Sequence, residues 1–294
     1  MIEIRVLSPG FLTTCQDLGR YGFAHLGISA SGAADALSLR WGNRLVGNPE
    51  GAAALEMTLV GGAFEFQSAA TIALTGSEFA ADVPWCEAFD IKAGETLRVG
   101  PTRAGARCYL CVRGGFSVPP VLGSSSTHVL TGMGGCGGRG LKKGDVLQVG
   151  DSAERPVIRE CFPLAVRRDV IRITDGPQHS WFTSGMDGQV YRVAEDSNRM
   201  GLRLEGPKLE STRELLTEGV SLGAIQVPRE GQPIITFVEH QTTGGYPKIA
   251  NVISADLPGV GQLRPRDEVK FELVSRTRAL EMLREQEARF CSLT

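Results

Sequence analysis

The segment from Glu239 to Pro247 holds the densest set of groups in this chain that can bind a small polar molecule. It reads Glu-His-Gln-Thr-Thr-Gly-Gly-Tyr-Pro and joins two apolar runs of strand-like composition. Amides, hydroxyls and an imidazole supply both donors and acceptors, and the glycine pair leaves backbone N–H groups open to a ligand. A wide, solvated hairpin tip is the alternative, since loops carry function often but not always. We predict that the ligand contacts Gln241, Thr242, Thr243, Gly244 and Tyr246.

One histidine lies beside this loop. The chain has four histidines, and they are far apart in sequence. A lone histidine is more often structural than catalytic, but His240 adjoins the polar loop, and an imidazole exchanges protons near neutral pH. His240 is therefore the histidine that we predict to take part in chemistry.

Two further segments place an acid close to an arginine among turn residues. Asp17 precedes Arg20 by three positions, and Asp196 precedes Arg199 by the same spacing. A guanidinium grips a carboxylate through two parallel hydrogen bonds, so Arg20 and Arg199 are predicted to bind a carboxylate. The alternative is a structural acid–arginine pair that braces a turn. Asp17 and Asp256 are the predicted base or water-orienting groups.

Two patterns suggest a nucleotide or metal site, and their context argues against both. The glycine-rich stretch 132–140 lacks the Lys-Ser/Thr ending of a P-loop, and we expect a strand rather than a helix after it. It is either a surface loop or a loop near an active site or an interface between subunits. Cys108 and Cys111 form a CxxC on an expected strand, where residues three apart point to opposite faces. We predict no metal site and no Walker-type ATP site.

The composition is that of a soluble globular protein. Of 294 residues, 22% are charged and 42% are hydrophobic, with a net charge of −2. This balance gives no electrostatic reason to expect a nucleic acid or a membrane surface as partner. The N-terminus alternates like a strand and lacks the pattern of a signal peptide, and seven cysteines are an odd number for a disulfide framework. We expect a cytoplasmic protein with reduced thiols.

Most segments of the chain have the composition of short strands. Thirty-seven glycines and fifteen prolines divide the sequence into β-branched and aromatic runs bounded by turn residues. Such repetition is typical of barrels and sandwiches. The expected strands cover residues 3–7, 63–66, 71–74, 96–99, 108–112, 146–149, 170–174, 224–227, 234–238, 249–253 and 269–273. The fold class is therefore mainly β.

Helices are expected to be few. One begins with Ser31 as N-cap and ends near Gly47, because apolar residues recur at helical spacing between them. A second covers Arg276–Arg289, and a short one follows Pro177. A polar, broken stretch near residues 151–169 is the best domain boundary, which gives an N-terminal β-rich domain over 1–160 and a C-terminal β-barrel domain with a terminal helix over 161–294.

Several motifs occur in an order that resembles a known family. They are Gln16–Arg20, Gly27–Asp35, Val112–Phe116, Leu122–Thr127, Asn198–Gly201, Gly223–Pro228 and Gln241–Pro247. Together they resemble the allophanate hydrolase subunit 2 family, also called the biotin-dependent carboxyltransferase or KipA-like family. The likeness runs from the first strand to about residue 275. It implies two β-barrel domains related to the cyclophilin fold.

The resemblance also implies partners and an activity. Members act with a subunit 1 (KipI-like) protein, and in many bacteria a third, lactam-utilisation-type subunit joins them in an ATP-dependent 5-oxoprolinase that opens 5-oxo-L-proline to L-glutamate. A subunit of this hydrolase, inactive by itself, is the expected function. The alternatives are a carboxyltransferase that moves a carboxyl group from carboxybiotin to a urea or amide acceptor, and a KipA-type regulatory binding protein. The chain has no Met-Lys-Met-type biotin attachment site, so ATP and any biotin are expected on other subunits.

Overall fold

The computed structural model describes residues 2–151, 155–159 and 167–292. These residues form two compact units. The N-terminal unit contains residues 2–20, 31–151 and 155–159, and the C-terminal unit contains residues 21–30 and 167–292. The predicted domain boundary after residue 160 lies outside the described residues.

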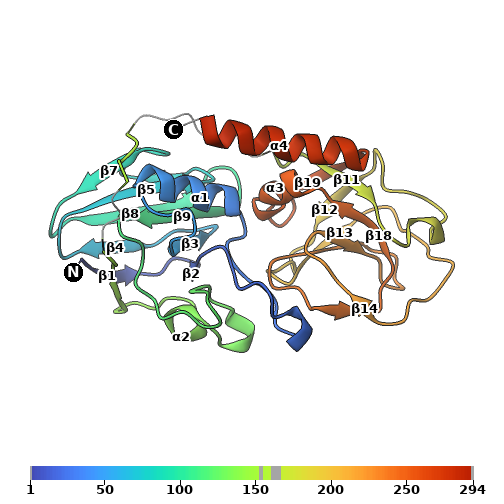
Figure 1. Cartoon of the computed structure of the whole chain (residues 1–294), viewed down its shortest axis with the longest axis horizontal. Helices are drawn as coiled ribbons and strands as arrows, with labels where there is room; N and C mark the ends of the chain where they lie inside the picture. Colours follow the sequence, from blue (N-terminus) through green and yellow to red (C-terminus); the bar gives the residue numbers. More distant parts are fainter. Residues whose placement is uncertain (1, 152–154, 160–166, 293–294) are drawn as a thin grey trace. The chain divides into compact units, whose positions relative to one another are not determined.

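Two five-stranded antiparallel sheets build the N-terminal unit (Figure 1, blue to green). In spatial order, one contains β10 (Val146–Gln148), β1 (Glu3–Ser8), β4 (Ala63–Phe66), β8 (Thr96–Thr102) and β6 (Phe79–Ala81). The other contains β2 (Leu12–Gln16), β3 (Ala54–Thr58), β9 (Arg107–Val112), β5 (Ala70–Gly76) and β7 (Ala88–Ile91). Side chains from both sheets, such as Ile4 and Phe64 from the first and Leu55 and Leu110 from the second, share one apolar core.

The expectation of two barrels is therefore wrong for this unit. Strand β9 explains why, because it is buried along almost its whole length. Its residue Cys108 belongs to the apolar core, whereas the thiol of Cys111 lies 3.9 Å from the carbonyl oxygen of Leu39. Leu39 belongs to helix α1 (Ala36–Leu45), so β9 lies between a helix and the second sheet. The two cysteines thus point to opposite faces, as their spacing predicts.

Helix α1 begins five residues later than the prediction of a Ser31 cap. The carboxylate of Asp35 accepts the N–H of Ser38 at 2.9 Å and is the N-cap. Ser31 instead has a positive φ of 55°, which is a left-handed conformation outside a right-handed helix. The apolar stripe holds, because Leu37, Trp41 and the last helical residue are all buried.

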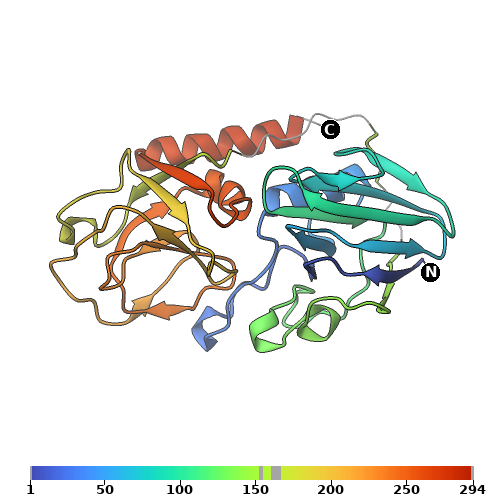
Figure 2. The ribbon, with the colours of Figure 1, turned by 180° about the vertical axis from the view of Figure 1, so that it is seen from behind.

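The C-terminal unit contains a closed barrel of seven strands (Figure 2). Around the barrel these are β11 (Val170–Asp175), β18 (Lys248–Val252), β15 (Ala224–Gln226), β16 (Ile234–Thr236), β13 (Gly201–Glu205), β12 (Val190–Val193) and β19 (Glu268–Leu273). Only β11 and β19 pair in parallel among these strands. A barrel in this half confirms the mainly β prediction there. Two short strands, β14 (Glu218–Gly219) and β17 (Thr243–Gly244), form a separate ladder.

The helices are short except for the last. They are η1 (Ala24–Leu26), η2 (Val129–Thr131), α2 (Gly135–Gly138), η3 (His179–Trp181), η4 (Ser254–Asp256), α3 (Leu257–Gly261) and α4 (Arg276–Ser292). Both predicted helices of this half, η3 after Pro177 and α4, are present, and Gln286 of α4 donates to the carbonyl of Ala255 at 2.9 Å. None of the described helices combines the length and the apolar character needed to cross a membrane.

Candidate functional site

The polar loop after β16 covers a cavity on the outer face of the barrel. Strands β16 and β18, which the loop joins, are not neighbours, because β15 lies between them. The loop therefore crosses the end of β15 instead of forming a hairpin tip. It encloses a cavity of about 500 Å³, which we call the loop cavity. Its lining residues are Asn198, Met200, Gly201, Arg203, Gln226, Ile234, Thr236, His240, Gln241, Gly245 and Tyr246.

Strand periodicity places these side chains. Successive residues of a strand point to opposite faces of the sheet. Leu202 and Ile235 are buried in the barrel, so the flanking positions of β13 and β16 face outward. Gln226 lies on the same outer face, because it follows the buried Ile225 in β15. The wall of the loop cavity is thus formed by the outward residues of three adjacent strands.

A backbone ladder fixes the middle of the loop. Strand β17 pairs with β14, and the N–H of Val220 donates to the carbonyl of Thr242 at 3.0 Å. Of the predicted ligand contacts, Gln241 and Tyr246 line the cavity. Thr242, Thr243 and Gly244 hold the loop in place through the backbone hydrogen bonds of this ladder. Their polar side chains were the signal in the sequence, whereas their backbone groups carry the structural role.

Two side-chain amides converge beside Gly244. A Cβ at this glycine would lie 2.8 Å from Nε2 of Gln226 and 3.0 Å from Nε2 of Gln241. Gln226 is only 2% exposed, and its Nε2 has no hydrogen-bond acceptor within the part of the chain that the structure describes. Buried donors without an acceptor are rare in folded proteins because each costs free energy. This amide faces a cavity large enough to hold a ligand that would accept from it.

His240 presents a neutral imidazole to the same cavity. Its Nδ1 lies 2.7 Å from the carbonyl oxygen of Gln241, and a carbonyl can only accept, so Nδ1 carries the proton. Burial lowers the pKa of His240 below its ordinary value, while the hydrogen bond to Gln241 opposes that effect in part. The neutral ring then leaves Nε2 as a proton acceptor.

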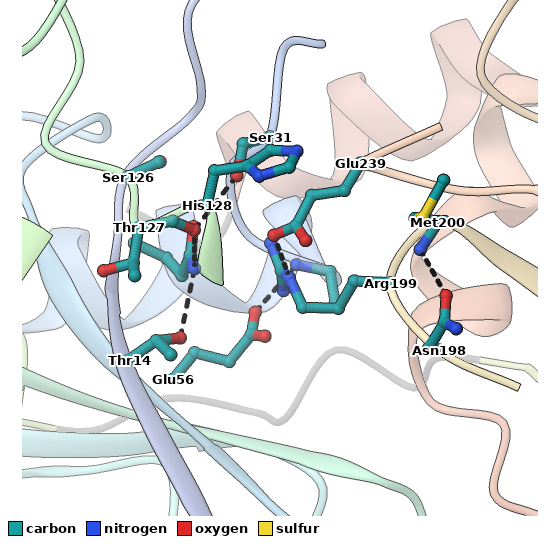
Figure 3. Close-up of polar contacts among 12 residues, drawn as sticks. Thr14, Ser31, Glu56, Ser126, Thr127, His128, Asn198, Arg199, Met200 and Glu239 are labelled. Atoms are coloured by element: carbon teal, nitrogen blue, oxygen red, sulfur yellow. Dashed lines mark hydrogen bonds and ion pairs between the residues drawn. The ribbon is translucent and has the colours of Figure 1, made fainter. Parts of the chain in front are cut away.

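The predicted carboxylate clamp Arg199 already binds an acid of the protein. Its Nε donates to the carboxylate of Glu239 at 2.5 Å, and the two side chains are 9% and 5% exposed (Figure 3). The backbone N–H of Glu239 also donates to the carbonyl of Arg199 at 2.8 Å. This geometry fits the structural alternative, in which the pair braces the start of the polar loop.

A different arginine lines the loop cavity. Arg203 pairs with Asp196 at 3.0 Å, and the two side chains are 54% and 69% exposed. Exposed pairs of this kind are weak, so Arg203 can turn to a ligand carboxylate at little cost. Asn198 also lines the cavity, and its Oδ1 accepts the N–H of Met200 at 2.8 Å (Figure 3).

The predicted base Asp17 lies in the N-terminal unit, and its carboxylate is already engaged. It accepts hydrogen bonds from the N–H groups of Gly19 and Ser125 at 2.7 and 2.6 Å. The hydroxyls of Ser124 and Ser126 also donate to it, at 2.6 and 2.5 Å. A carboxylate with this many donors is held in its charged form and is a poor base.

Arg20 braces the same serine-rich loop. It is 2% exposed, and its guanidinium donates to the carbonyl oxygens of Ser126 and Val121. These contacts again fit the structural alternative. The geometry gives Arg20 a role in holding backbone rather than a ligand carboxylate.

The other predicted base, Asp256, binds an arginine across the end of the barrel. Its carboxylate accepts from the backbone N–H of Arg172 at 2.7 Å and from the Nε of the same residue at 2.9 Å. This carboxylate raises the pKa of Arg172 above its usual value. Asp256 therefore anchors η4 to strand β11 and does not face the loop cavity.

The glycine-rich segment does not have the form of a nucleotide site. It folds into η2 and the four-residue α2, and a Cβ at Gly138 would lie 1.9 Å from the carbonyl oxygen of Gly132. The segment is thus folded tightly on itself rather than open to phosphates, and a helix this short presents no useful dipole. Across the described ranges, no group of three or more His, Cys, Asp or Glu residues is placed to hold a metal ion.

Sequence reasoning missed Gln226, Arg203 and Asn198 as site residues. The available signal was strand periodicity, because Gln226 and Arg203 are polar residues at outward positions of barrel strands. Outward polar residues are common on any barrel, so this signal needs the topology to become specific. Only the crossing of the loop over β15 sets these residues apart.

Comparison with protein families gives one match over most of the chain. Residues 26–273 match the model described as "Carboxyltransferase domain, subdomain A and B". Among curated proteins, the chain is 39% identical to a subunit of the 5-oxoprolinase of Escherichia coli, over 98% of this chain and 96% of that protein. It is 38% identical to the 5-oxoprolinase subunit of the same name from Haemophilus influenzae, over 97% and 95% of the two chains.

A solved structure shows the same fold. The urea amidolyase of Kluyveromyces lactis superposes with a TM-score of 0.92 at 31% identity, over 99% of this chain. The match covers 20% of the yeast protein. The chain is therefore similar to one region of a much larger enzyme.

Proposed function

Because this chain belongs to the family of carboxyltransferase domains with subdomains A and B, we propose that it acts as one subunit of a 5-oxoprolinase. The proposed reaction opens the ring of 5-oxo-L-proline to give L-glutamate. The observation that carries this proposal is the similarity to a bacterial 5-oxoprolinase subunit over nearly the full length of both chains. Similarity confined to one domain would support only a shared fold.

Ring opening makes clear demands on a binding site. Water must add to the lactam carbonyl, the C–N bond must break, and the ring nitrogen must receive a proton. The enzyme therefore has to orient a small amide, stabilise the negative charge that develops on its oxygen, and move a proton. We place these tasks in the loop cavity, where amide donors, a neutral imidazole and a cation are found together.

Each task has a residue in this scheme. Gln241 donates to the lactam oxygen, and Nε2 of His240 takes a proton from the attacking water and returns it to the ring nitrogen. Arg203 attracts the substrate carboxylate by charge, in place of the Arg199 that the sequence predicts. Tyr246 covers the rim of the cavity. Thr242, Thr243 and Gly244 keep the loop in shape.

The proposed complex includes other chains. Among the described residues, the glycine-rich segment does not fit a nucleotide, so ATP dependence is assigned to another subunit, and no step here depends on it. The proposed partners are a subunit 1 (KipI-like) protein and a third, lactam-utilisation-type subunit. Biotin is not expected on this chain.

Glutamate release tests the proposal directly. The chain is co-expressed with its genomic neighbours and supplied with 5-oxo-L-proline and ATP, and each protein is then omitted in turn. Activity that needs this chain supports the proposal, and we expect Gln241→Ala to lower kcat/KM at least tenfold. The exposed Gln189 provides a matched control, Gln189→Ala, which should leave the rate unchanged. A soluble, complete set without activity contradicts the proposal.

Carboxyl transfer from carboxybiotin is the second candidate. The fold shared with urea amidolyase over 99% of this chain favours it. In this scheme the same cavity holds a urea or amide acceptor. Transfer of labelled bicarbonate to urea, with a biotin carrier and a carboxylase added, would establish this activity, and glutamate release would then be absent.

A further inference from the structure

The loop cavity contains a donor that the proposed scheme does not use. Nε2 of Gln226 is buried, lines the cavity and has no acceptor among the described residues. Neighbouring polar groups of the wall differ in this respect. The hydroxyl of Thr236, for example, donates to the carbonyl of Ser221 at 2.7 Å.

The position of this donor is set by the barrel. Gln226 ends β15, and its backbone pairs with Ile234 on one side and Lys248 on the other. A side chain anchored on both sides has little freedom to turn toward solvent. The loop closes over it, with Gly244 as the nearest backbone. An acceptor for this amide must therefore come from within the cavity.

Gln241 supplies a second donor at the same place. The amide nitrogens of Gln226 and Gln241 would lie 2.8 and 3.0 Å from a Cβ on Gly244. Any side chain larger than glycine would push both amides apart. Two N–H donors that converge in this way suit one oxygen atom with two lone pairs, such as a carbonyl oxygen. The same arrangement stabilises an oxygen that becomes negative during a reaction.

We propose that Gln226 and Gln241 form a two-donor site for the ring carbonyl of a cyclic amide. Gln226 is thereby a specificity-determining residue, since a ring without a carbonyl leaves its buried amide without an acceptor. Sites of this kind reject the analogue that lacks the polar atom far more strongly than apolar pockets reject a missing methylene. The inference takes its lactam from the proposed function.

The first test follows the Gln226 amide itself. The full chain is labelled with ¹⁵N, and the side-chain NH₂ signal of Gln226 is assigned by its loss in Gln226→Met. Titration with 5-oxo-L-proline or 2-pyrrolidinone should shift this signal, and L-proline, which has no ring carbonyl, should not. If neither lactam shifts the signal, or if proline shifts it equally, the two-donor site is overturned.

The second test uses the co-expressed complex. Gln226→Met keeps the length of the side chain and removes the donor, and we expect kcat/KM for 5-oxo-L-proline to fall about tenfold. Gly244→Ala should cause a comparable loss by pushing the two amides apart, and Gln189→Met is the exposed control. An active complex that is unaffected by Gln226→Met contradicts this site and leaves the proposed function intact. A lactam-dependent shift in an inactive complex does the reverse.

Discussion

The two units each contain a dense polar cluster, and the clusters differ in how their hydrogen bonds are satisfied. In the N-terminal unit, both oxygens of Asp17 accept hydrogen bonds from the surrounding turn and serine loop. In the C-terminal unit, the loop cavity leaves the donor of Gln226 without a protein acceptor among the described residues. Satisfied networks hold a fold together, and a donor left open toward a cavity is available to a ligand. The comparison separates positions that stabilise from positions that bind.

The buried pair Arg199–Glu239 should show the largest effect on stability. Replacing Arg199 with Met leaves the carboxylate of Glu239 buried without this cation, which costs about 3–5 kcal/mol. Urea denaturation measures the loss, read as the change in the free energy of unfolding. The double variant Arg199→Met, Glu239→Gln should recover part of it, because no buried charge is left unpaired.

An intact Arg199→Met protein would blur the comparison. A loss below about 1 kcal/mol would show that the pair is worth no more than an exposed one. Arg199 would then again be available as a ligand clamp. The exposed pair of Arg229 and Glu214, about 80% accessible on both sides, gives the control, and Arg229→Met should change stability by well under 1 kcal/mol.

The cluster around Asp17 should show the next largest effect. Asp17→Asn keeps the shape but turns two acceptor oxygens into one oxygen and one NH₂ group, which faces N–H and O–H donors. We expect about 2–3 kcal/mol of destabilisation, since each charged hydrogen bond contributes about 1.5–3 kcal/mol. Binding of 5-oxo-L-proline by the folded fraction should be unchanged. Loss of binding without loss of stability would restore Asp17 as a candidate base.

The sequence made the loop identifiable but could not rank its residues. Density of amides, hydroxyls and glycines marked positions 239–247, and Gln241, Tyr246 and His240 line the cavity as a result. Acid–arginine proximity was a weaker guide, because a bidentate pair looks the same in sequence whether its partner is a ligand or the protein. Asp17, Asp256 and Arg199 each found that partner within the chain.

The architecture divides in the same way. Alternating strands predicted a mainly β protein, and the C-terminal barrel and helix α4 follow from local patterns. The two open sheets of the N-terminal unit do not, because a short strand has the same composition in a barrel and in a sandwich. The cap at Asp35 rather than Ser31 depends on one residue's φ angle, which composition leaves open.

Gln226 gives a smaller effect of opposite sign. Gln226→Met removes a buried donor that lacks a protein acceptor, so the variant should be as stable as the parent or about 1 kcal/mol more stable. Its affinity for lactams should fall at the same time. Thermal unfolding with and without 5-oxo-L-proline reads out both quantities, and Gln189→Met should change neither. Destabilisation of more than about 2 kcal/mol would show that the amide has a structural role, as Asp17 has.

The smallest effect should come from the titration of His240. Burial lowers the pKa of His240 below its ordinary value of 6.5, so the unfolded chain binds more protons than the folded one just below pH 6.5. This contribution to stability is complete above pH 6.5 and is lost as the pH falls through the folded pKa. His240→Gln should therefore flatten the acid side of the stability profile by about 1 kcal/mol or less, measured by urea denaturation between pH 5 and pH 8. If the profile of the variant matches that of the parent, His240 titrates normally, and its neutral Nε2 no longer distinguishes the loop cavity from an ordinary polar surface.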